Sequence, residues 1–258
     1  MLSTLTSYRL VVRDIEKSTA SAKADRSSVR ETAYFLSKIG SIKTIDQFIG
    51  DRRVFNFAMK ALGLGDMTNA RALMRKVLEG GTDANDSLAN KLSDPRFREF
   101  ANVFDFKRFG SATTSFDSAQ KGVVDRYARQ MLEESAGRDN EGVRLALYFE
   151  RKAPQISSVY QFLADPALFK VVQTAFNLPS ATTSSALDKQ AELLSRKIPI
   201  ADLKSPAKVA KLLERFAVFW DLNQRTAPPP TTIAPLQQAS AVVSAETLAA
   251  IQNLKRGG

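Results

Sequence analysis

The sequence predicts an all-α protein in which two tandem copies of a four-to-five-helix unit form one compact helical array, followed by a Pro-rich linker and a C-terminal helix. Three observations predict this class. Apolar residues recur at intervals of three and four, as they do on one face of an α-helix. No segment sustains the alternation of apolar and polar residues that is typical of a half-buried strand. The sequence also matches itself, without gaps, when it is shifted by 114 residues.

The self-match is strongest over residues 30–79, where 14 positions are identical to those 114 residues later. Most matched positions are large apolar residues or residues that cap helices. Such positions carry the packing of a helical unit, so the match indicates two copies of one fold. We therefore predict a first repeat unit at residues 1–113 and a second at residues 114–226.

Helix boundaries follow from apolar stripes and capping residues. The stripes predict helices over residues 5–15, 28–39, 118–135 and 140–152, with Asp139 as the N-cap of the last. An Asp side chain accepts free backbone N–H groups at a helix start, and Pro costs no hydrogen bond at the first helical position. On this basis the following residues are assigned as structural helix starts: Asp51, Asp94, Pro95, Asp165 and Pro166.

The end of the chain differs in composition from the repeat units. Residues 227–238 contain the run Pro228-Pro229-Pro230, which is typical of a stiff, extended linker. Residues 239–258 are predicted to form one more helix. Because a helix this short is marginal alone in water, it is expected to dock on the core or on a partner, and both alternatives stay open.

The composition excludes several kinds of chemistry. The chain has no Cys and no His, so it has no disulfide, no Cys or His metal ligand and no Ser-His-Asp triad. It also lacks Gly-rich phosphate or dinucleotide loops, and we expect no cofactor. No apolar run is long enough to span a bilayer, and we expect no membrane insertion. The charged residues near the N-terminus argue against a Sec signal peptide.

The chain is basic, with a net charge of +10 and a pI of about 9.8, so nucleic-acid binding has to be considered. The excess is spread along the chain: 19 basic against 13 acidic residues over 1–113 give +6, and 16 against 13 over 114–226 give +3. Two basic clusters have helical spacing, within residues 71–76 and 204–215. We interpret both as solvated helix faces and do not expect a nucleic-acid partner.

Three segments resemble those of a known family: MLSTLTSYR at residues 1–9, TIDQFIGDRRVFNFAMKALGL at 44–64 and DPRFREFANVFDF at 94–106. Together they resemble a bacterial family of unknown function encoded in flagellar gene clusters, whose members are sometimes labelled flagellar basal-body rod proteins. The resemblance extends over about residues 1–226. It implies a role in flagellar assembly or function and brings no catalytic residues with it.

The expected function is therefore that of a non-enzymatic, flagellum-associated structural or assembly protein that acts through contacts between helices. The expected partner is a flagellar protein or a second copy of the chain, and the expected location is the cytoplasm or the flagellum, with export by the flagellar apparatus left open. Two alternatives are kept: a basic helical regulator that binds nucleic acid, and an enzyme that uses carboxylates. The candidate partner-binding residues are the apolar positions of the first and last helices: Leu5, Val12, Ile15, Val243, Leu248, Ile251 and Leu254.

Overall fold

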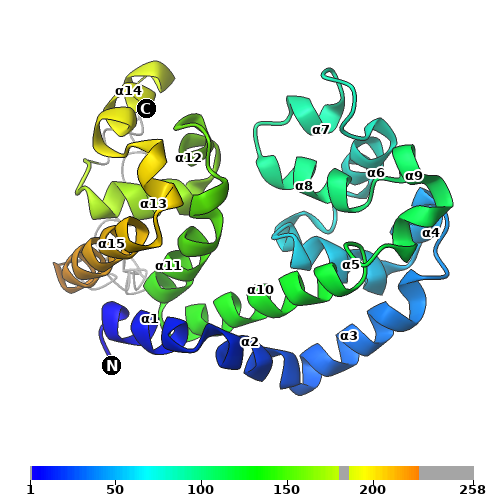
Figure 1. Cartoon of the computed structure of the whole chain (residues 1–258), viewed down its shortest axis with the longest axis horizontal. Helices are drawn as coiled ribbons and strands as arrows, with labels where there is room; N and C mark the ends of the chain where they lie inside the picture. The colour runs from blue at the N-terminus through cyan, green and yellow to red at the C-terminus, as the bar shows by residue number, and fades with distance from the viewer. Residues whose placement is uncertain (1, 180–185, 227–258) are drawn as a thin grey trace, which may run out of the picture. The chain divides into compact units, whose positions relative to one another are not determined.

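The structure is a computed structural model in which residues 2–179 and 186–226 are described, and all their regular elements are helical (Figure 1). This confirms the predicted all-α class for these residues. The α-helices are α1 (Thr4–Arg13), α2 (Ile15–Ala24), α3 (Arg26–Ile39), α4 (Ile45–Gly50), α5 (Arg52–Ala61), α6 (Arg71–Gly80), α7 (Leu88–Lys91), α8 (Pro95–Val103), α9 (Phe106–Phe109), α10 (Lys121–Asp139), α11 (Glu141–Lys152), α12 (Tyr160–Ala164), α13 (Pro166–Ala175), α14 (Leu187–Lys197) and α15 (Pro206–Thr226). Four short 3-10 helices join them: η1 (Gly65–Met67), η2 (Gly110–Ser115), η3 (Ala153–Gln155) and η5 (Ile200–Lys204).

Residues up to Gln224 form one compact unit. The predicted linker at 227–238 and the predicted helix at 239–258 lie outside the described residues. None of the described helices combines the length and the apolar character that crossing a bilayer requires.

Two hydrophobic cores hold the unit together. The first core is rich in fully buried phenylalanines, and the rings of four of them contact one another: Phe48, Phe55, Phe100 and Phe104. The fifth, Phe35, stacks on Phe57. The second core has three fully buried phenylalanines of its own: Phe149, Phe162 and Phe216. Burial of these large rings is the main favourable term for folding.

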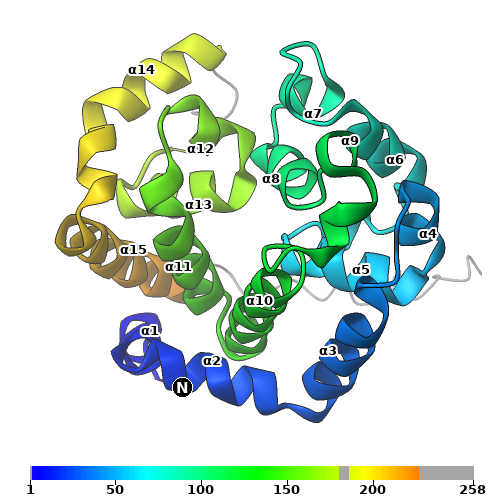
Figure 2. The same cartoon turned by 45° about the vertical axis from the view of Figure 1, so that its right-hand side comes forward.

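The packing crosses the repeat boundary predicted at residue 113. Helix α10, from the second predicted unit, lies beside α5 and places Val123 and Tyr127 in the first core (Figure 2). Helix α1, from the first predicted unit, contacts α11 and places Tyr8 in the second core. The opening helix of each predicted unit therefore packs on the other unit.

One hydrogen-bonded pair recurs in both halves at the offset found in the sequence. The Tyr34 hydroxyl donates to Asp51, the N-cap of α5, over 2.9 Å. The Tyr148 hydroxyl donates to Asp165, the N-cap of α13, over 2.6 Å. Helices α5 and α13 begin and end at positions that are also 114 residues apart. In each half a tyrosine from the preceding long helix thus fixes the start of the central helix.

The structure corrects two predicted boundaries. The predicted helix over residues 5–15 is interrupted at Asp14, which leaves the helical conformation and caps α2 by accepting from the Lys17 N–H. The N-cap of α11 is Asn140 and not Asp139, because Asn140 Oδ1 accepts from the Gly142 N–H over 2.9 Å. Asp139 is instead the last residue of α10, which begins and ends later than the predicted 118–135.

The central helices end in the same way in both halves. Gly63 and Asn177 follow α5 and α13 with positive φ angles of 75° and 49°. In each case the next residue donates its N–H to a carbonyl five positions back, over 2.8 Å. This is the left-handed helix ending in which glycine is favoured, because the Cβ of other residues makes a positive φ sterically unfavourable.

We expect Gly63→Ala to lower the free energy of unfolding by about 1 kcal/mol, because alanine is strained at positive φ. The same reasoning expects Asn177→Gly to raise it by a few tenths of a kcal/mol, since asparagine tolerates this conformation better than alanine. Urea unfolding of the full chain measures both. A Gly63→Ala variant as stable as the wild type would contradict this explanation of the helix end.

Candidate partner-binding site

The predicted partner-binding residues of the first helix are largely used within the fold. Leu5, Val12 and Ile15 are half-buried. Val12 and Ile15 pack against the second core. The stripe therefore holds α1 in place, which leaves little of it for a partner. The other candidates, Val243, Leu248, Ile251 and Leu254, lie outside the described residues.

Polar contacts fix the start of α1 on α11 and α15. Thr4 is buried, and its N–H donates to the Asp221 carboxylate over 3.0 Å. The Asn140 side-chain amide donates to the Thr4 hydroxyl over 2.9 Å. These contacts bring both ends of the described chain together at one point of the second core.

The carboxylates at the predicted helix starts accept backbone hydrogen bonds. Asp94 accepts from the Arg96 N–H, with Pro95 in the first turn of α8. Asp51 and Asp165 each accept from two N–H groups in the first turn of α5 and α13, and Pro166 opens α13. The geometry at all three positions is that of an N-cap.

The two basic clusters of the sequence differ in their surroundings. In the first, Arg71 donates to the Ile49 carbonyl over 2.7 Å, and Arg75 is ion-paired with Asp46. Two of its three cations therefore already form polar contacts within the fold. In the second, Lys204 donates to the Pro154 carbonyl over 2.8 Å, and the other three cations lie along α15, beside a cavity.

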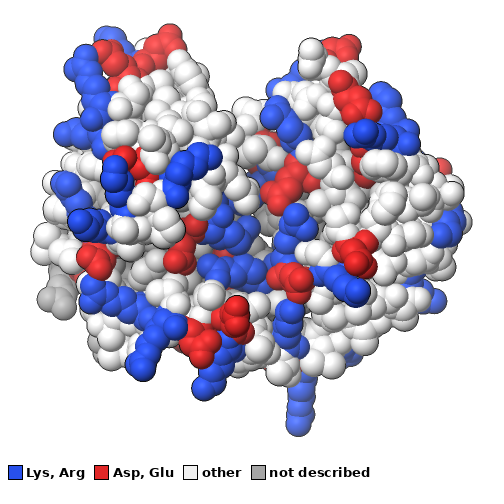
Figure 3. Space-filling model, in the orientation of Figure 1, with Lys and Arg blue, Asp and Glu red and all other residues white. Residues whose placement is uncertain are grey.

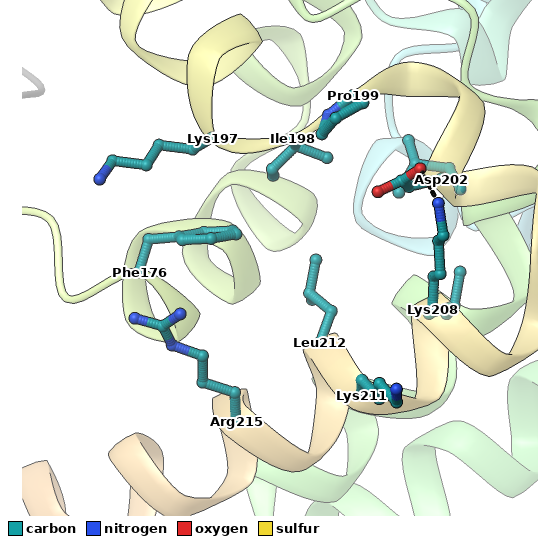
Figure 4. A pocket seen from close by; sticks show the side chains of 11 residues that line it. Phe176, Lys197, Ile198, Pro199, Asp202, Lys208, Lys211, Leu212 and Arg215 are labelled. Atoms are coloured by element: carbon teal, nitrogen blue, oxygen red, sulfur yellow. Dashed lines mark hydrogen bonds and ion pairs between the residues drawn. The ribbon is translucent and has the colours of Figure 1, made fainter.

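That cavity, which we call the α15 groove, has a volume of about 270 Å³ and lies between the end of α13, the end of α14, η5 and α15 (Figure 4). Figure 4 shows Leu212 pointing from α15 into it, opposite Ile198 and Pro199. It is lined by Phe176, Lys197, Ile198, Pro199, Asp202, Leu203, Lys208, Val209, Lys211, Leu212 and Arg215. Ile198, Leu203 and Val209 are buried, so the floor of the groove is apolar.

The rim of the groove is basic. Lys208 is paired over 2.5 Å with Asp202, the one acidic lining residue in the part of the chain that the structure describes. The Arg215 guanidinium lies over the Phe176 ring at 5.1 Å and near the Phe219 ring at 5.7 Å, which holds it in place by cation–π attraction. Among the described residues, Lys197, Lys211 and Arg215 have no carboxylate within ion-pair distance. The groove thus combines an apolar floor with uncompensated positive charge.

A cluster of buried ions lies elsewhere, where α10 packs on α11. The Glu133 side chain is 2% exposed and accepts from Arg151 through two hydrogen bonds of 2.7 and 2.8 Å. Arg129 adds a third contact at 3.3 Å. Burial acts to raise the pKa of Glu150 beside them, and the charge of Arg129 opposes it. Cationic partners on each side are typical of a structural ion network.

Glu99 is a further paired carboxylate, between Lys152 at 2.9 Å and Arg126 at 3.4 Å. Burial is the largest single effect and acts to raise its pKa. The charge and hydrogen bond of Lys152, with the charges of Arg126 and Arg151, together outweigh burial, so the pKa of Glu99 lies below its usual value. Such a group stabilises the fold above the unfolded-state pKa of about 4.3 and loses this contribution as the pH falls through the folded-state pKa.

Glu99→Gln is therefore expected to lower stability most near neutral pH, with the difference from the wild type shrinking below about pH 4. Urea unfolding between pH 3 and 7 measures this. Lys152→Gln should remove most of the same pH dependence, because Lys152 is the main source of the shift. A stability difference that grows as the pH falls would contradict the assignment.

A second cavity, of about 670 Å³, lies beside α5, α10 and α11. Its charged lining residues are largely paired with each other, Lys60 with Glu134 at 2.9 Å and Arg144 with Glu141. Figure 3 shows acidic and basic side chains interleaved on this face of the molecule. The α15 groove is therefore the better candidate for a charged partner.

Sequence reasoning found part of this site and missed the rest. It identified the basic spacing along residues 204–215 but interpreted it as a solvated face. It gave no signal for Phe176, Ile198 and Leu212, which come from three different elements and meet only in the folded chain.

Comparison with known proteins places the chain in a family. The model of a protein family of unknown function, DUF1217, matches residues 61–209. The chain belongs to the DUF1217 family. The crystal structure of a protein from Agrobacterium tumefaciens, determined by a structural genomics consortium, is 49% identical to this chain in sequence. It aligns with a TM-score of 0.80 over 86% of this chain and 97% of that one. No curated protein matches this DUF1217 chain.

Proposed function

We propose that this DUF1217 protein is a non-enzymatic structural or assembly protein of the flagellum, located in the cytoplasm or at the flagellum, and that it acts by binding a flagellar protein through its helices. The observation that carries the binding role is the α15 groove, with its apolar floor and its uncompensated cations. The flagellar setting rests on the resemblance of residues 1–9, 44–64 and 94–106 to proteins encoded in flagellar gene clusters.

We also infer that the helical array arose by duplication of one unit. The matching positions of α5 and α13, the recurring tyrosine–aspartate pairs and the two left-handed helix ends support this inference. The packing of α1 and α10 across the two cores gives a reason for the two copies to stay together, since each copy buries a helix of the other.

Affinity purification of the full chain from motile cells tests the proposed function. We expect a flagellar protein to be enriched relative to the same purification from a strain that makes no flagella. The full chain should be used, because residues 227–258 belong to the protein and carry four of the predicted partner-binding positions. Identical sets of bound proteins from the two strains would contradict the proposal.

A further inference from the structure

We propose that the α15 groove binds an acidic amphipathic helix of the partner protein, with apolar side chains on the floor and carboxylates on the basic rim. That the partner is flagellar rests on the proposed function; the chemistry of the bound segment rests on the groove alone.

The charge of the groove favours an acidic partner. Four basic residues and one acidic residue line the groove, Lys197, Lys208, Lys211 and Arg215 against Asp202, so its net charge is +3. Within the described part of the chain, Lys208 is the one cation of the four that is paired with a carboxylate. A cationic rim attracts carboxylates and repels a basic segment, which favours an acidic partner.

The volume of the groove suits side chains of a larger partner. Pockets for whole small ligands usually have volumes of about 300–1,000 Å³ and enclose most of the ligand. At about 270 Å³ the groove is smaller than that range. It has room for side chains that project from a larger partner. The half-buried Phe176 and Leu212 offer those side chains an apolar surface.

The length of the groove along α15 matches that of a short helix. The lining residues of α15 fall on successive turns, from Lys208 through Lys211 and Leu212 to Arg215. Val218 continues this face one turn further and is 58% exposed. At 1.5 Å per residue, positions 208–218 span about 15 Å, or three turns. A partner helix with apolar residues at i, i+4 and i+7 fits a surface of this length.

The aromatic residues distinguish a helix from a nucleic acid. Proteins that bind single strands stack bases on exposed aromatic rings. Here Arg215 lies over Phe176 and near Phe219, so the guanidinium already occupies the position a base would take. The groove therefore favours aliphatic side chains and carboxylates over bases and phosphates.

A peptide titration tests the proposal. The probe is a fluorescein-labelled 14-residue peptide, held helical by a hydrocarbon staple, with leucines on one face and glutamates flanking them. The matched peptide has the same composition, with leucines and glutamates distributed evenly around the helix. Fluorescence anisotropy with the full chain should show binding of the first peptide and at least tenfold weaker binding of the second.

Two charge-reversal variants locate the binding. Lys211→Glu/Arg215→Glu is expected to weaken binding at least tenfold. Arg52→Glu/Lys76→Glu makes the same change in net charge at exposed positions on α5 and α6 and should leave binding unchanged. Thermal unfolding followed by circular dichroism should be the same for both double variants and the wild type. Leu212→Ala, which leaves every charge in place, should also weaken binding of the first peptide.

Three results would overturn the proposal: equal binding of the two peptides, equal effects of the two double variants, or displacement of the peptide by single-stranded DNA of equal charge. These outcomes are independent of the flagellar setting. Binding in the groove with no flagellar protein in the affinity purification would contradict the proposed function and leave this inference standing. A flagellar partner that binds the Lys211→Glu/Arg215→Glu variant as well as the wild type would contradict this inference and leave the proposed function standing.

Discussion

Replacement of Glu133 by Gln is expected to lower the free energy of unfolding by about 3–5 kcal/mol, the usual cost of breaking a buried ion pair. The Glu133 side chain is 2% exposed and lies between Arg129 and Arg151, which are themselves 17% and 27% exposed. Without the carboxylate, two largely desolvated guanidinium groups face each other. Chemical denaturation followed by circular dichroism measures the change.

The chain contains a matched control. Glu192 and Arg196 form an i,i+4 pair like Arg129 and Glu133, but their side chains are 62% and 74% exposed. Glu192→Gln should cost less than about 0.5 kcal/mol, because solvent screens an exposed pair. Similar losses for the two variants would show that the cluster between α10 and α11 does not stabilise the fold in the way described.

Gly142→Ala is expected to destabilise the protein by about 1–3 kcal/mol, in the range measured for overpacked sites. Gly142 lies in the first turn of α11, and a Cβ there would lie 2.6 Å from two ring atoms of Trp220 and 2.9 Å from the Thr4 side chain. The single tryptophan of the chain would have to move, so its fluorescence should change along with the thermal midpoint.

Gly50→Ala is the matched control for this prediction. Gly50 ends α4, and a Cβ there meets nothing within 4 Å. Alanine should therefore be neutral or stabilising by up to about 1 kcal/mol, as its helix propensity predicts. In a Trp220→Ala background, Gly142→Ala should cost much less than it does in the wild type, because the two atoms nearest the added Cβ belong to Trp220. An equal cost of Gly142→Ala in the two backgrounds would contradict the steric explanation.

Local rules predicted the parts of the fold that local chemistry decides. An Asp or an Asp-Pro pair at the start of an apolar stripe is enough to place a helix start, because the cap satisfies N–H groups only two or three residues away. This is why Asp51 and Asp94 could be placed from the sequence. Where two capping residues stand side by side, as at Asp139 and Asn140, the choice depends on whether α10 extends to Asp139, which packing decides.

Contacts between residues that are far apart in the sequence could not be predicted from local sequence patterns. Arg129 and Glu133 have the spacing of an ordinary exposed helix pair, and their burial comes from α11 packing on α10. The α15 groove combines residues from α13, α14 and α15 that are up to 39 positions apart, from Phe176 to Arg215. Only the cations of α15 left a pattern in the sequence, because Lys208, Lys211 and Arg215 lie on one helix.

The swimming of a strain that lacks this gene tests the central claim most directly. The account predicts reduced swimming in soft agar or a reduced number of flagella, restored when the full chain is supplied again. Normal swimming with a normal number of flagella in the deletion strain would contradict a flagellar role for this protein.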